Sequence, residues 1–133
     1  MDRPIIAAVD FDGILCQDKF PEIGKPNYDM VSFVRRLQDS GIETILWTSR
    51  VGDRLAEAIA WCEDRGLHFT SINNNTPSNK EQYGTDPRKV YADVYIDDRS
   101  PWMMYKSRSD GLHLSEMINY VIRIIGQLGG KLV

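Results

Sequence analysis

The sequence lacks several features that would place the protein in a specialised class. Only two cysteines, Cys16 and Cys62, occur in 133 residues, and they show neither metal-ligand spacing nor a disulfide framework. We therefore expect a reducing, cytoplasmic setting. No apolar run approaches the roughly 18 residues that a membrane span needs. Residues 1–4 do not begin a basic segment followed by a long apolar one, so a secretory signal is not expected.

The sequence also has only a small excess of negative charge and lacks several common catalytic motifs. The formal net charge is only −3, and a non-specific nucleic-acid binder would usually be basic. The sequence contains neither a glycine-rich Walker loop nor a Ser/His/Asp pattern, which argues against P-loop and serine-hydrolase chemistry. His68 and His113 stand alone, without a His or Cys at ligand spacing, so structural roles are favoured for both.

What the sequence does contain is a regular alternation of apolar segments and helical patterns. We expect strands at 5–9, 42–47, 67–72 and 94–96, and helices at 30–40, 53–65 and 114–128. Turn-forming residues dominate 10–29 and 73–86, with room for a short helix in the second stretch. This order predicts parallel βαβ units with right-handed crossovers. The expected fold is one α/β domain over residues 1–133, a three-layer α/β/α sandwich around a mostly parallel sheet.

Two of the apolar strands end in paired carboxylates. Asp10 and Asp12 follow the strand at 5–9, and Asp97 and Asp98 follow the strand at 94–96. If the two strands are parallel, all these carboxylates meet at the carboxyl edge of the sheet, where open α/β sheets bind ligands. Crowded negative groups repel one another unless a cation lies among them. Hard oxygen ligands suit Mg²⁺, which commonly takes one or two carboxylates together with substrate phosphate.

The first of these pairs lies in the sequence Asp10-Phe11-Asp12-Gly13. Gly13 permits a sharp bend, so that Asp12 can turn back toward the site that Asp10 faces. One carboxylate can then act as a nucleophile and the other as a general acid and base. An isolated Asp-x-Asp is common and simply begins many polar loops. The apolar strand before it and the glycine after it make the motif specific.

These motifs resemble those of the haloacid dehalogenase-like (HAD) superfamily, and the resemblance extends from residue 5 to about residue 99. It implies a Rossmann-like core in which Asp10 is the nucleophile that forms an aspartyl-phosphate. Asp12 would protonate the leaving group and then activate water. Asp10, the backbone carbonyl of Asp12 and Asp98 would hold Mg²⁺, with Asp97 in support. The family commonly has Thr after the glycine, and Ile14 lacks that hydroxyl.

Further positions match the phosphate-binding motifs of the same superfamily. Thr48 follows the strand at 42–47, and its hydroxyl would bind a phosphate oxygen together with nearby backbone N–H groups; Ser49 is the neighbouring candidate. Arg50 is either a fork-shaped phosphate donor or a solvated loop charge. Lys89, just before the last strand, would offset the charge of the nucleophile and the phosphate. Lys80, in the preceding polar loop, is its rival.

Together these residues predict a Mg²⁺-dependent phosphatase that works through an aspartyl-phosphate. Residues 14–29 and 73–86 are too short for a cap domain, so we expect an open site. Such a site suits a phosphorylated macromolecule, whereas a nucleic-acid end is disfavoured by the acidic charge. Two alternatives stay open. One is a nucleotide or sugar-phosphate phosphatase whose site is closed by homo-oligomerisation. The other is a non-catalytic phosphate- or Mg²⁺-binding interaction module, which Ile14 alone favours. Residues 102–105 are expected to be packing residues, with a substrate rim or dimer contact as the alternative.

Overall fold

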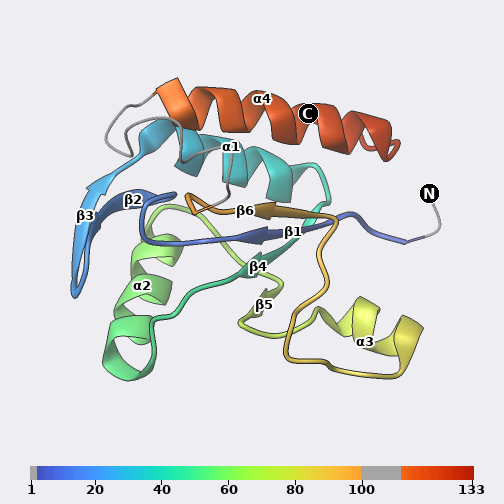
Figure 1. Ribbon diagram of the computed structural model, residues 1–133, viewed down its shortest axis with the longest axis horizontal. Coiled ribbons are helices and arrows are strands. Elements are labelled where there is room, and N and C mark those ends of the chain that lie inside the picture. Colours follow the sequence, from blue (N-terminus) through green and yellow to red (C-terminus); the bar gives the residue numbers. More distant parts are fainter. Residues whose placement is uncertain (1–2, 100–111) are drawn as a thin grey trace.

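A computed structural model describes residues 3–99 and 112–133, and residues 102–105 lie outside these ranges. Three strands come first, and from the first helix onward helices and strands alternate along the chain, as the sequence predicted (Figure 1). The elements are β1 (Ile6–Val9), β2 (Cys16–Lys19), β3 (Glu22–Pro26), α1 (Tyr28–Asp39), β4 (Glu43–Leu46), α2 (Gly52–Asp64), β5 (Ser71–Ile72), α3 (Pro77–Tyr83), β6 (Val94–Ile96) and α4 (Leu112–Gln127). Among the described residues, no helix combines the length and the apolar character needed to cross a membrane.

The main sheet is parallel, which confirms the α/β prediction. Its strand order is β5-β4-β1-β6, with Ala8 of β1 opposite Ile45 of β4 on one side and Tyr95 of β6 on the other. All four residues of β1 are buried, as expected for a central parallel strand. Since β1 and β6 run in the same direction, the segments that follow them meet at one edge (Figure 1).

Alternate residues of β1 face two different clusters of apolar side chains. Ala7 and Val9 belong to the larger cluster, which also contains buried residues of α1, α2 and α4. Helices α1 and α4 lie side by side, and they contact β4 and β6 respectively (Figure 1). Ile6 and Ala8 belong to a smaller cluster, which is completed by residues of the segment that leads into β6, among them Val90.

Helix α1 shows why the predicted helices form. Its buried residues recur at helical spacing, and Val34 and Leu37 are fully buried against the sheet. Burying one such side chain contributes about 1.5–3 kcal/mol, so packing of this face, rather than intrinsic propensity, holds the helix. The helix ends before Gly41, as predicted. Gly41 has a φ of 82°, a left-handed conformation that glycine adopts readily and that commonly ends a helix.

Two segments differ from the sequence-based expectation. The stretch 10–29 is not only loop, because β2 and β3 form an antiparallel hairpin that pairs Lys19 with Glu22. Most residues of these strands are polar and at least partly exposed, so they carry no apolar alternation that would indicate a strand. The strand expected at 67–72 is reduced to β5, because only Ser71 and Ile72 pair with β4 while Leu67 packs into the core.

Candidate functional site

The segments after β1, β4 and β6 and the β2–β3 hairpin enclose a cavity of about 230 Å³ at the carboxyl edge of the sheet. This is the edge at which open α/β sheets bind ligands. The cavity is lined mainly by charged and hydroxyl side chains, namely Asp10, Asp12, Asp18, Phe20, Thr48, Ser49, Arg50, Asp98 and Arg99. Most of the residues singled out from the sequence therefore meet at one place, although they come from three separate parts of the chain.

Asp10 leaves β1 at the centre of this edge. Its backbone N–H donates to the carbonyl of Ile96 (2.9 Å), which fixes it beside the end of β6. Its Oδ1 accepts a hydrogen bond from the N–H of Phe11 (2.8 Å). Burial and, to a smaller extent, the nearby Asp97 carboxylate together raise the pKa of Asp10 to about 8, against the opposing effect of the Phe11 hydrogen bond. Without a cation, Asp10 is therefore largely protonated at neutral pH.

Asp97 and Asp98 complete an acidic cluster with Asp10. One carboxylate oxygen from each of the three lies within 4.8 Å of the others. Asp97 Oδ1 also accepts the N–H of Arg99 (2.8 Å), and Asp98 is buried. A Cβ at Gly13 would collide with the Asp98 carboxylate, and the φ of Gly13 is 88°, so glycine is required there on both counts. A cluster of oxygen donors alone, together with the raised pKa of Asp10, fits a hard divalent cation such as Mg²⁺.

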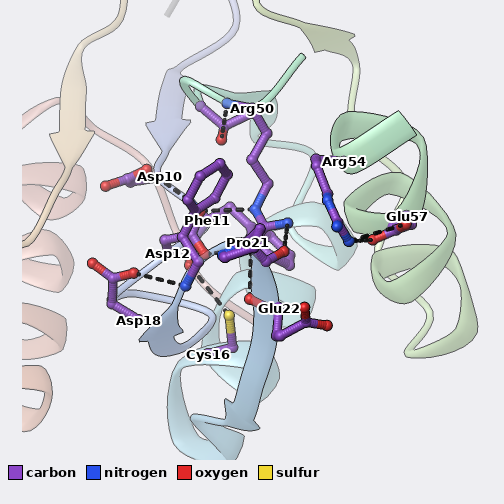
Figure 2. A network of polar contacts seen from close by, with 12 residues as sticks. Asp10, Phe11, Asp12, Cys16, Asp18, Pro21, Glu22, Arg50, Arg54 and Glu57 are labelled. Carbon is purple, nitrogen blue, oxygen red and sulfur yellow. Dashed lines mark hydrogen bonds and ion pairs between the residues drawn. The ribbon is translucent and has the colours of Figure 1, made fainter. Parts of the chain in front are cut away.

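Arg50 occupies a position that the sequence did not predict. Its side chain is only 1% exposed, and Nε and Nη2 donate to the two carboxylate oxygens of Asp12, each at 2.8 Å (Figure 2). Nη1 donates to the carbonyl of Pro21 and Nη2 also donates to that of Glu22. Arg50 is therefore not a solvated loop charge. Its fork is engaged by protein acceptors instead of being open to a phosphate.

Thr48 and Ser49 line the cavity, as predicted for phosphate-binding residues. The N–H of Thr48 donates to Oδ1 of Asn73 (2.8 Å), a residue with a left-handed φ of 53°. The N–H of Arg50 donates to Thr48 Oγ1 (3.1 Å). The hydroxyl hydrogen of Thr48 remains available to a ligand, since that bond uses the oxygen only as an acceptor.

Neither of the two lysines considered from the sequence lines this cavity. Lys89 Nζ lies over the ring of Tyr95, 5.8 Å from its centroid. Lys80 Nζ is 3.5 Å from Asp86 Oδ2, and its helix α3 lies at the opposite end of the molecule from the hairpin (Figure 1). Two arginines line the cavity, Arg50 and Arg99. Among the described residues, the Arg99 side chain has no hydrogen-bond or ion-pair partner, and only its backbone N–H is bonded, to Asp97.

Two lining residues were missed because the hairpin was missed. Asp18 and Phe20 both come from it, and the Phe20 ring is 60% exposed while one of its faces lies 5.1 Å from the guanidinium of Arg50. No apolar alternation in this segment indicates a strand. The two cysteines are not nucleophiles, because burial raises the pKa of Cys16 to about 11 and that of Cys62 to about 12.

No family profile and no curated protein matches the chain. A solved structure of a conserved protein from Bacteroides thetaiotaomicron is similar, with 36% sequence identity and a TM-score of 0.70 over 89% of this chain and 92% of that one. The chain belongs to the family of this conserved Bacteroides protein. The Bacteroides protein shares the α/β fold described above. No activity is stated for the Bacteroides protein, so the function must be argued from the site.

Proposed function

We propose that the protein is a Mg²⁺-dependent phosphatase that works through an aspartyl-phosphate, with a capless, three-layer HAD-like core. The observation that carries this proposal is the cluster of Asp10, Asp97 and Asp98, whose carboxylate oxygens lie within 4.8 Å of one another. Asp12 and Thr48 line the same cavity. A nucleophile, an acid and base, a cation site and a phosphate-binding hydroxyl are thus available within one small volume.

The cation would be held by Asp10, Asp98, the backbone carbonyl of Asp12 and, in support, Asp97. When bound, Mg²⁺ supplies positive charge that offsets the crowded carboxylates and orients the phosphate. Burial and Asp97 raise the pKa of Asp10 to about 8, so the ionised form of Asp10 needs a nearby positive charge. A carboxylate attacks phosphorus only in its ionised form, so the residues at this edge need a neighbouring cation to work at neutral pH.

The chain's own residues account for two chemical steps. Asp10 attacks phosphorus through a carboxylate oxygen, while the N–H of Phe11 donates to its Oδ1 and helps to fix the side chain. As the new P–O bond forms, the bond to the leaving oxygen breaks, and Asp12 donates a proton to that oxygen. Asp12 must therefore enter this step as the carboxylic acid, with one of its two hydrogen bonds from Arg50 given up to the proton. Asp12 then takes a proton from water, whose oxygen attacks phosphorus and displaces the Asp10 carboxylate. Inorganic phosphate leaves, and both aspartates return to their starting forms.

Binding of the phosphoryl oxygens falls to the hydroxyl of Thr48, to Ser49 and to Arg99. Arg99, rather than the predicted Lys89, would offset the charge of the phosphate, because Arg99 lines the cavity and Lys89 does not. An arginine offers a planar fork that matches two phosphate oxygens. Its charge would offset that of the phosphate beside the acidic cluster.

The size of the cavity bears on the substrate. At about 230 Å³, the part formed by the described residues is smaller than the roughly 300–1,000 Å³ of pockets that enclose drug-sized ligands. It holds a phosphoryl group while most of the leaving group stays outside. This supports an open site for a phosphorylated macromolecule, or for a small metabolite once a second subunit covers it.

The test is hydrolysis of p-nitrophenyl phosphate with Mg²⁺ and with EDTA, by the wild type and by Asp10→Asn. Metal-dependent turnover that disappears in the variant is expected, because Asn keeps the volume of Asp but cannot serve as the nucleophile. Equal turnover by the variant would rule out Asp10 as the nucleophile. A wild type that hydrolyses neither this ester nor a panel of natural phosphate esters would favour the binding module instead.

A further inference from the structure

We propose that Arg50 is a positioning residue that fixes the Asp12 carboxylate and fastens the β2–β3 hairpin to it. The part of this inference that concerns Asp12 rests on the proposed function. The part that concerns the hairpin stands on the geometry alone. Arg50 lies 38 residues from Asp12 in sequence, so the contact ties the loop after β4 to the loop after β1.

The first observation is the bidentate pair. Nε of Arg50 donates to Asp12 Oδ2 and Nη2 donates to Oδ1, both at 2.8 Å. Two parallel hydrogen bonds fix the rotation of a carboxylate as well as its place. The adjacent Ile14 is fully buried and offers no hydrogen-bonding side chain for this purpose. The orientation of Asp12 is therefore set by Arg50.

The second observation is that the same guanidinium holds the turn of the hairpin. Nη1 donates to the carbonyl of Pro21 (3.2 Å), and Nη2 donates to that of Glu22 (2.9 Å). The Cζ atom of Arg50 also lies over two aromatic rings, 5.1 Å from the centroid of each, one from Phe11 and one from Phe20 of the hairpin. Hydrogen bonds to four protein oxygens and contacts with two aromatic rings restrict the guanidinium to a narrow range of orientations.

The hairpin that Arg50 contacts also forms one wall of the cavity. Asp18 and Phe20, which line it, are carried by the hairpin that Arg50 holds. One side chain thus contacts both the Asp12 carboxylate and the wall of the cavity that the hairpin forms, so its loss should affect both.

The hairpin half is tested by hydrogen exchange of the backbone amides in β2 and β3. Arg50→Met keeps the stem and removes the fork, and we expect exchange there to be about tenfold faster or more, as loss of a charge-assisted hydrogen bond predicts. Arg50→Lys keeps the charge without the fork and should also speed the exchange of these amides. It provides the test if Arg50→Met does not fold. Exchange in β1 and β4 should not change. Arg54→Met, at an exposed arginine of α2, is the matched control. Unchanged hairpin exchange in folded Arg50→Lys overturns the proposal, whether or not the protein is a phosphatase.

The Asp12 half is tested by kinetics with two leaving groups. Arg50→Lys should lower kcat roughly 10- to 100-fold for an alkyl phosphate, which needs a proton on its leaving oxygen, and much less for p-nitrophenyl phosphate, which does not. KM should stay the same. In the Asp12→Asn background the same change should cause no further loss, because the residue acts through Asp12. Equal and additive losses would show a merely structural role, and a raised KM with unchanged kcat would show a phosphate ligand. Either result overturns the positioning role.

Discussion

Replacing Asp10 by Asn should remove a pH dependence of stability that the acidic cluster imposes on the metal-free protein. Burial and the neighbouring Asp97 raise the pKa of Asp10 from 3.8 to about 8 in the folded state. The folded protein therefore binds this proton more tightly than the unfolded chain does. The free energy of unfolding must then fall as pH rises between these two pKa values.

The magnitude follows from the two pKa values. Each unit of difference corresponds to about 1.4 kcal/mol, so Asp10 alone lowers the stability of the wild type by roughly 4 kcal/mol between about pH 5 and pH 8. Below the ordinary pKa of 3.8 the effect is absent, and above about 8 it is fully developed. Asn does not titrate, so this part of the slope disappears in the variant. Mg²⁺ should flatten the slope of the wild type as well, because it favours the ionised cluster.

Urea unfolding followed by tryptophan fluorescence, in EDTA and over this pH range, measures the effect. The difference between the wild type and Asp10→Asn cancels the contributions of all other titrating groups that the variant leaves unchanged. The variant should gain stability over the wild type as pH rises. Parallel stability curves for the two proteins in EDTA would refute the claim that burial and the neighbouring carboxylates raise the pKa of Asp10.

Three further predictions concern single residues of the site. Gly13→Ala should lower the free energy of unfolding by about 1–3 kcal/mol, because its Cβ collides with Asp98 at a left-handed φ; unchanged urea unfolding would contradict this. Arg99→Ala should raise KM for p-nitrophenyl phosphate about tenfold or more, as expected for one lost charge-assisted contact. The matched variant Lys89→Ala should leave KM unchanged, and the reverse pattern would show that Lys89, not Arg99, binds the phosphate. Asp12→Asn should lose roughly 100-fold in kcat with alkyl phosphates and less with p-nitrophenyl phosphate, and equal losses would count against its role as general acid.

Much of the fold and the acidic cluster could be predicted because the signals are local. β1 and β6 are short apolar segments that end in carboxylates, and parallel pairing alone brings Asp10, Asp97 and Asp98 to one edge. The helices follow from the spacing of their buried residues, as in α1. For these features, the position of a side chain depends mainly on the element that carries it.

The remaining parts depend on contacts between distant segments. The hairpin was missed because its polar strands are held by their mutual pairing and by Arg50, and neither leaves a periodic pattern. The role of Arg50 depends on a partner 38 residues away. Lys89 was assigned by its place before the last strand, but the path of the chain into β6 directs it to Tyr95. No spacing rule shows that path in advance.

The most direct test of the central claim is to trap the covalent intermediate. The protein would be mixed with Mg²⁺ and p-nitrophenyl phosphate, quenched in acid within the first turnover, digested and analysed by mass spectrometry. We predict one added phosphoryl group on Asp10, sensitive to hydroxylamine and absent from Asp10→Asn. Metal-dependent turnover without any phosphoryl group on Asp10, or with the group on another residue, would contradict the account.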